Sequence, residues 1–166
     1  MSQQKTIYRI TTFFRKRPDL TEQQFYDHWG NVHGPLVIPW ALKHGVLEYT
    51  QYQTPAELRS LVTAGMDPAF AAGLDFHAAA DWHVESWERY LAAYNDPYYR
   101  QVIEPDEDNF VDKGQTGDKV EVVRAVTTLG YCRYMIRDGK PSADVSEEIW
   151  DRFSRMQESN QPEKKD

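Results

Sequence analysis

The stretch "TIYRITTFFRKRPDLTEQQF", residues 6–25, determines the first two elements of the fold. Its first part, residues 6–14, is rich in β-branched and aromatic side chains and short enough for one strand. Pro18 marks a turn after that strand. Thr21 is typical of a helix N-cap, and Gln24 completes the capping-box pattern. The stretch therefore predicts a strand that turns directly into a helix.

The predicted helix runs on into "FYDHWGNVHGPL", residues 25–36. Phe25 and Trp29 fall on one helical face and indicate its buried side. We expect the Gly-Pro pair at 34–35 to end the helix, because such pairs are typical terminators. His33 then stands at the helix C-terminus, where the helix dipole favours a protonated imidazole.

Strand-like and helix-like segments alternate along most of the remaining chain. Further strands are predicted at 46–53, 77–86 and 129–136, and helices at 55–65 and from Trp87 onward. A short irregular or helical connection, broken by Pro39, precedes the second strand. This order predicts a ferredoxin-like α+β fold with a four-stranded antiparallel sheet and helices on one face. Since the other face stays open, we expect two copies to pair as a dimeric α+β barrel.

The chain divides into a main domain and an extension. Its 166 residues suit one core-bearing domain, which we place at 1–139. The Asp-Gly pair at 138–139 predicts a tight turn. The extension at 140–166 holds one amphipathic helix, and its last ten residues are polar enough for us to expect disorder.

Composition narrows the classes of partner. The net charge is −7 and the pI near 5.2, whereas nucleic-acid binding usually needs a basic surface. No apolar run approaches the roughly 20 residues of a membrane span, and no signal-peptide pattern opens the chain. The single cysteine, Cys132, excludes an internal disulfide framework. We therefore expect a cytoplasmic protein that binds neither nucleic acid nor membrane.

Common cofactor and hydrolase motifs are missing. The chain has no G-x-G-x-x-G after a strand, no P-loop, no H-E-x-x-H and no G-x-S-x-G. The acidic stretch "EPDEDNFVD", residues 104–112, lacks the EF-hand spacing, so we interpret it as a solvated loop that packs Phe110 against the sheet. We expect no cofactor and no metal.

The segment "DWHVE" offers one group of candidate catalytic residues. Side chains alternate along a strand, so Asp81, His83 and Glu85 share one face. If Trp82 faces the helices, Asp81 and His83 lie on the open side of the sheet, which we expect to form the pocket in a ferredoxin-like dimer. There Asp81 can orient His83 and raise its basicity. His77 shares that face if the strand is regular. The alternative is a solvated or dimer-interface salt network, and three groups along one strand converge poorly on a metal ion.

A second group of candidates surrounds the first helix. His33 can donate a proton to a substrate in an adjacent pocket, or it can simply cap the last carbonyls of the helix. Tyr49 is a candidate pocket phenol, and Gln51 shares its strand face. Tyr8 and Trp29 complete the predicted lining. An aromatic pocket of this kind suits a flat aromatic or polyphenolic ligand.

Three of these stretches together resemble one family. The segment "FFRKRPDLTEQQFYDHWGNVHGPL" resembles the opening of EthD-domain proteins. The segment "AADWHVESWERY" is similar to their third strand, and "EPDEDNFVD" is similar to their acidic stretch. The resemblance covers residues 6 to about 137 and implies a cofactor-free dimeric α+β barrel in the main domain.

The resemblance also implies a function and two site residues. Fungal members look like lyases that dehydrate or decarboxylate aromatic polyketide intermediates in secondary metabolism. The family pattern carries over to His33 and Asp81. We therefore expect a lyase with His33 as acid, His83 as base or acid, Asp81 as its orienter and Tyr49 as a donor to a carbonyl. Two alternatives stay open: a cofactor-independent anthrone-type monooxygenase, and a non-enzymatic accessory protein that binds the ligand.

Overall fold

The computed structural model describes residues 6–67, 76–114 and 125–159. The chain forms two compact units, Met1–Tyr131 and Cys132–Asp166, which are described separately below. The division between them falls after Tyr131, and the boundary predicted from the sequence falls after Gly139. Within the described ranges, no helix is long and apolar enough to span a membrane.

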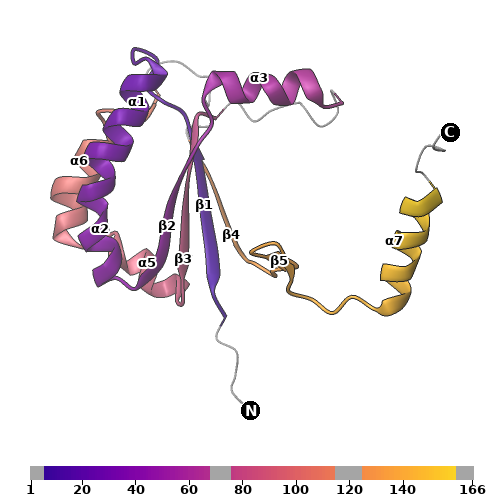
Figure 1. Cartoon of the computed structure of the whole chain (residues 1–166). Coiled ribbons are helices and arrows are strands. Elements are labelled where there is room, and N and C mark those ends of the chain that lie inside the picture. The colour runs from indigo at the N-terminus through magenta and orange to yellow at the C-terminus, as the bar shows by residue number, and fades with distance from the viewer. Residues whose placement is uncertain (1–5, 68–75, 115–124, 160–166) are drawn as a thin grey trace. The chain divides into compact units, whose positions relative to one another are not determined.

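Four antiparallel strands form the sheet of the first unit (Figure 1). They are β1 (Tyr8–Phe14), β2 (Val46–Gln53), β3 (Ala78–Val84) and β4 (Ala125–Tyr131), in the order β2-β3-β1-β4. This arrangement confirms the predicted ferredoxin-like sheet. A register irregularity between Val46 and Glu48 brings Tyr49 opposite Trp82 and Thr50 opposite Asp81.

The fourth strand begins earlier than predicted. We expected it at 129–136, but β4 spans Ala125–Tyr131 and pairs with the whole of β1. The predicted start at Leu129 divided a β-branched run that in fact forms one continuous edge strand. Two threonine contacts support this register: Thr127 Oγ1 lies 3.0 Å from Thr12 Oγ1, and Thr128 Oγ1 donates to the Thr11 carbonyl.

The first helix also differs from its prediction at the C-terminal end. Helix α1 (Glu22–His28) begins at the expected capping box, but a π-helical turn η1 (Trp29–His33) joins it to α2 (Gly34–Lys43). The Gly-Pro pair therefore continues the helix, and the expected break at Pro39 is also absent because that residue lies inside α2. Pro35 lacks the N–H that a continuous helix would use at this position, and the π-helical turn lies directly before it.

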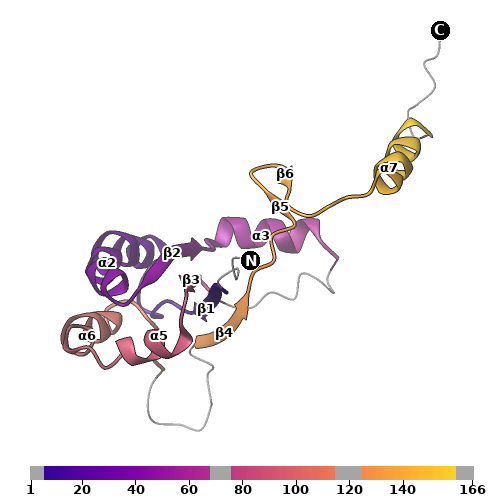
Figure 2. The ribbon, with the colours of Figure 1, turned by 90° about the horizontal axis from the view of Figure 1, so that it is seen from below.

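One layer of helices covers one face of the sheet (Figures 1 and 2). It contains α1, η1, α2, α5 (Trp87–Ala93), η2 (Tyr99–Ile103) and α6 (Glu104–Glu107). Helix α6 corrects the interpretation of residues 104–112 as a loop, although Phe110 is buried as expected. The predicted helix at 55–65 is confirmed as α3 (Ala56–Gly65), which lies on the other side of the sheet and has no buried residue (Figure 2).

Two aromatic-rich clusters join this helix layer to the sheet. One gathers around Trp40, Trp82 and Tyr90, and the other around Phe25, Trp29 and Phe110. Each cluster combines side chains of the sheet with side chains of the helices, so the helix face of the sheet is the buried one. A cavity between the sheet and the helix layer is therefore expected to have aromatic walls.

The second unit contains a hairpin and a helix. Strands β5 (Ile136–Arg137) and β6 (Lys140–Pro141) are joined through the predicted Asp-Gly turn, in which both residues have positive φ. Helix α7 (Glu147–Ser159) confirms the predicted amphipathic helix. Of the ten residues expected to be disordered, 157–159 extend this helix and the rest lie outside the described residues.

Candidate functional site

A partly enclosed cavity of about 170 Å³ lies between the sheet and the helix layer. The sheet and the helices both contribute aromatic walls to it. Its lining consists of Thr12, Phe14, Trp29, His33, Tyr49, Ala80, Trp82, Tyr90, Tyr94, Glu107, Phe110, Val111 and Ala125. A dry cavity of about 150 Å³ is enough to hold benzene. This one therefore encloses roughly one aromatic ring and leaves the rest of a larger ligand toward its open side.

His33 enters this cavity from the π-helical turn. Its side chain is buried, and Nδ1 lies 2.9 Å from Oδ2 of Asp106. An ionised carboxylate only accepts hydrogen bonds, so the proton of a neutral imidazole is held at Nδ1 and the lone pair at Nε2 stays available. The structure thus gives His33 the proton-accepting nitrogen that a general base needs.

The electrostatics of His33 differ from the prediction. The pKa of His33 is lowered, chiefly by burial, with His28 and Lys113 adding to the fall and Asp106 opposing it. The prediction of a protonated imidazole assumed a helix C-terminus, but the helix continues beyond His33 as α2. We therefore assign His33 a neutral resting state near pH 7.

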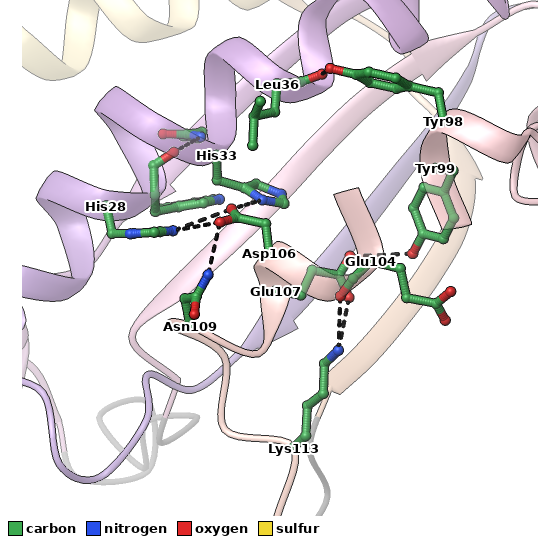
Figure 3. Close-up of polar contacts among 12 residues, drawn as sticks. His28, His33, Leu36, Tyr98, Tyr99, Glu104, Asp106, Glu107, Asn109 and Lys113 are labelled. Carbon is green, nitrogen blue, oxygen red and sulfur yellow. Dashed lines mark hydrogen bonds and ion pairs between the residues drawn. The ribbon is translucent and has the colours of Figure 1, made fainter. Parts of the chain in front are cut away.

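Asp106 is the hub of the polar network beside the cavity (Figure 3). One carboxylate oxygen lies 3.0 Å from His28 Nε2 and accepts from Asn109 Nδ2 at 3.0 Å, while the other faces His33. Burial acts to raise the pKa of Asp106, but these partners together hold it below its usual value. The carboxylate therefore stays ionised and holds the imidazole of His33 in place.

Tyr49 reaches the cavity from β2. Its ring stacks on Trp82 with centroids 4.0 Å apart and an interplanar angle of 9°. Gln51 Nε2 donates to the Tyr49 hydroxyl oxygen at 2.9 Å and to the Trp29 carbonyl at 2.9 Å. Because its oxygen already accepts a hydrogen bond, the Tyr49 hydroxyl can donate its own proton to a ligand. Burial raises the pKa of Tyr49, so the phenol stays protonated.

Glu107 provides a second carboxyl group at the cavity wall. Tyr99 Oη donates to Oε1 of Glu107 at 3.2 Å, and Lys113 Nζ lies 3.5 Å from Oε2 (Figure 3). Burial raises the pKa of Glu107 against the lowering effect of Lys113. A carboxyl group with a raised pKa beside an aromatic cavity is a candidate proton donor.

The predicted Asp81–His83 pair lies on the opposite face of the sheet from this cavity. Asp81 accepts from Arg9 Nε at 2.8 Å and from Thr11 Oγ1 at 2.6 Å. His83 Nδ1 lies 3.0 Å from Oε2 of Glu48 on the adjacent strand. The placement on the open face is confirmed, and the positive charge of His83 acts to lower the pKa of Asp81, but the carboxylate in ion-pair distance of His83 is Glu48, a cross-strand neighbour that was not visible in the sequence.

The remaining predicted residues divide between the cavity and its surroundings. Trp29 lines the cavity, and Gln51 contacts two of the lining residues. Tyr8 packs against the core cluster around Trp82. His77 precedes β3, and its ring lies edge-on to Phe25 at 6.5 Å, so the expected continuation of the His83 face ends before this residue.

A family model matches the chain over residues 17–114, which is more than half of its length, and its description is "EthD domain". The chain belongs to the EthD-domain family. Dehydratase aurZ of Gibberella zeae is 27% identical over 138 residues, which cover 83% of this chain and 85% of that protein. Decarboxylase claH of Passalora fulva is 26% identical over 131 residues and 79% of each chain.

A solved structure supports the same fold. An EthD-like protein from Ralstonia eutropha JMP134 is 17% identical and has a TM-score of 0.50, covering 76% of this chain and 92% of its own. The matched region of the EthD model includes the π-helical turn and α6, which carry His33, Asp106 and Glu107.

Sequence reasoning missed Asp106 and Glu107 in this EthD-domain chain. The acidic composition of residues 104–112 suggested solvent exposure. The available signal was the resemblance of this stretch to the family, because an acidic segment that resembles a family pattern is a candidate for a functional site. Within the described ranges, no group of three or more histidine, cysteine, aspartate or glutamate side chains is arranged to hold a metal ion.

Proposed function

We propose that this EthD-domain chain is a cofactor-free lyase that removes water or CO2 from a hydroxylated aromatic intermediate of polyketide type. The observation that carries the proposal is the His33–Asp106 pair opening onto the same aromatic cavity as the Tyr49 hydroxyl. The names of its relatives, dehydratases and decarboxylases, support a lyase reaction.

His33, Asp106 and Tyr49 each have a separate role in the proposed reaction. Nε2 of His33 takes a proton from the carbon next to a carbonyl, while Asp106 stabilises the imidazolium that forms. The Tyr49 hydroxyl donates to the carbonyl oxygen, where negative charge develops in the enolate. In decarboxylation His33 instead takes a proton from solvent and, as the imidazolium, gives it to the carbon that loses CO2.

The aromatic lining determines the class of substrate. The stacked Tyr49–Trp82 pair offers a flat wall against which a planar ring can lie. A polycyclic substrate inserts its reacting ring and extends the others toward the open side. A flat, partly reduced phenolic ring therefore suits the cavity better than a flexible aliphatic acid.

Turnover of a hydroxyanthrone carboxylate by the purified protein tests the proposal. Mass spectrometry of the product distinguishes loss of water, loss of CO2 and gain of oxygen, and the last result would support the monooxygenase alternative instead. Binding without turnover would support an accessory protein. We expect His33→Gln and Tyr49→Phe to lower kcat/KM by about 100-fold or more.

Two control variants sharpen this test. Tyr52→Phe removes an exposed hydroxyl from the same strand as Tyr49 and leaves the cavity unchanged, so we expect full activity. His83→Gln tests the predicted catalytic role of the other sheet face. Full activity of His83→Gln together with an inactive His33→Gln places the chemistry in the cavity, and the reverse pattern contradicts our assignment.

We also propose that the chain forms a homodimer through the face of the sheet that carries Asp81 and His83. The helices that pack on the sheet lie on its other face. The open face combines the Arg9–Asp81 ion pair with Phe13, Tyr52 and Val126. Such a mixture of polar pairs and large apolar side chains is suited to a protein–protein interface.

A further inference from the structure

Asp106 and Glu107 are consecutive on α6, but their carboxyl groups point in different directions (Figure 3). Asp106 faces His28 and His33, as described above. Glu107 faces Tyr99 and Lys113 and lines the cavity. The proposed function assigns a role to Asp106 but none to Glu107.

We propose that Glu107 is the second proton-transfer group of the cavity, and that it protonates a leaving hydroxyl so that the chain releases water rather than CO2. This inference rests on the proposed function and selects one of its two reactions. The substrate class that it names is a neutral β-hydroxyketone fused to an aromatic ring.

The number of proton-transfer groups favours loss of water. Removal of water from a β-hydroxyketone breaks a C–H bond and a C–O bond on neighbouring carbons. It needs a base at the first carbon and an acid at the leaving oxygen. His33 and Glu107 are two such groups on one cavity. Decarboxylation needs a proton donor at one carbon only and has no leaving hydroxyl.

The charge of the cavity wall points the same way. The lining residues, all of them in the described part of the chain, include no lysine or arginine. The ionised Asp106 stands behind His33. A substrate carboxylate would find no lysine or arginine among the lining residues and would face the negative charge of Asp106, which disfavours its binding. A neutral hydroxyketone avoids this repulsion.

The proposed step is balanced. His33 Nε2 takes the proton of the carbon next to the carbonyl, and the electron pair of that C–H bond becomes the new C=C bond. The C–O bond breaks, and its electron pair leaves with the hydroxyl oxygen, which takes the proton of Glu107 and departs as water. The proton then on His33 returns to the Glu107 carboxylate through solvent, and no oxidant or reductant takes part.

Titration of the two groups is compatible with these roles. Burial raises the pKa of Glu107, with Glu104 adding to the rise and with Lys113 and Tyr99 opposing it. Burial lowers the pKa of His33. The two proton affinities therefore approach each other, which eases the return of the proton after each turnover. Tyr94 also faces Glu107, and burial keeps this phenol protonated.

Two probes that give the same product test the inference. β-Hydroxy-α-tetralone gives α-naphthol by loss of water, and 1-hydroxy-2-naphthoic acid gives α-naphthol by loss of CO2, so one fluorescence assay follows both. We expect the unaltered protein to convert the tetralone and not the acid. Conversion of the acid alone would overturn the inference and leave the lyase proposal standing, and conversion of neither would overturn both.

Substitutions then test the proposed role of Glu107. We expect Glu107→Gln to lower tetralone conversion by about 100-fold or more and to remove the alkaline limb of its pH profile, because the amide cannot donate the proton. Glu57→Gln, at an exposed position of α3 outside the cavity lining, is the matched control and should keep full activity. An unchanged pH profile in Glu107→Gln would overturn the assignment. Unchanged thermal unfolding of both variants confirms that each is folded.

Discussion

The proton-accepting nitrogen of His33 depends on a residue more than seventy positions away in the chain. Asp106 holds Nδ1 at 2.9 Å and so directs Nε2 away from itself. Burial alone would only make the imidazole less basic. The carboxylate opposes that effect and stabilises the charge that appears on the ring during proton transfer. His33 is therefore best treated as one member of a pair.

Replacement of Asp106 by asparagine tests this pairing. The amide removes the charge that raises the pKa of His33, so the acidic limb of the kcat/KM profile should move to lower pH. The imidazole also loses its fixed tautomer, and we expect kcat/KM at its optimum to fall by about 10–100-fold. The measurement is the pH dependence of turnover of the dehydration probe.

Asp27→Asn is the matched control for that experiment. This exposed carboxylate on α1 accepts a hydrogen bond from Gln23 Nε2 and is not part of the cavity lining. The Asp27→Asn substitution also removes one negative charge from the helix layer, and we expect an unchanged pH profile of kcat/KM. A profile in Asp106→Asn identical to that of Asp27→Asn would show that Asp106 does not act on His33.

At the scale of elements, the π-helical turn between α1 and α2 positions the site. It widens the helix by one residue, directs His33 toward the cavity, and brings Gly34 against Gln51 of β2. A Cβ atom at Gly34 would lie 3.1 Å from Gln51 Nε2 and 3.3 Å from the Trp29 carbonyl oxygen. The missing side chain therefore allows helix and strand to approach closely enough for Gln51 to bond both Trp29 and Tyr49.

Substitution of Gly34 by alanine tests this close contact through its effect on the free energy of unfolding. Alanine is favoured over glycine in a helix by about 1 kcal/mol, whereas overpacking costs about 1–3 kcal/mol. We expect a net loss of stability in urea unfolding. In a Gln51→Ala background only the smaller contact with the Trp29 carbonyl remains, so the same change should become neutral or stabilising.

Gly65→Ala provides the comparison, because no neighbour lies within 4 Å of a Cβ atom there. Additive effects of the Gly34 and Gln51 substitutions would contradict the proposed contact. Non-additivity of about 1 kcal/mol would support it.

Local chemistry explains which elements could be predicted from the sequence. The strands at 8–14, 46–53 and 78–84, the capping box at Thr21 and the helix in the tail all follow from patterns within a few residues. The continuation through the Gly-Pro pair could not be predicted, because it depends on packing of the wider turn against β2. The extent of β4 depends likewise on the length of β1.

The candidate site could likewise be predicted only in part, because some of its contacts join residues that are distant in the sequence. His33, Tyr49 and Trp29 were chosen as pocket residues, and the structure brings all three to one cavity. The partner of His33 was not found, because α6 approaches α1 only in the folded chain. His83 was paired with a residue on its own strand, whereas its neighbour Glu48 comes from the adjacent strand.

At the scale of the molecule, the two faces of the sheet have different proposed roles. One face carries the helix layer and the cavity, and the other carries ion pairs and the side chains of the proposed dimer interface. Val126 lies on this second face, opposite Phe13, and is 38% exposed. A dimer closed through this face would bury Val126 against apolar side chains.

Val126→Lys therefore tests the dimer. A charge at this position would be desolvated in the interface, so we expect a shift toward monomers of 19.4 kDa in sedimentation or light scattering. Ile38→Lys places the same charge at a half-exposed site of α2 in the helix layer and should leave the mass of the assembly unchanged. A monomeric unaltered protein at all concentrations would contradict the proposal. A dimer disrupted only by Ile38→Lys would place the interface on the helix layer, and it would then lie on the same side of the sheet as the cavity.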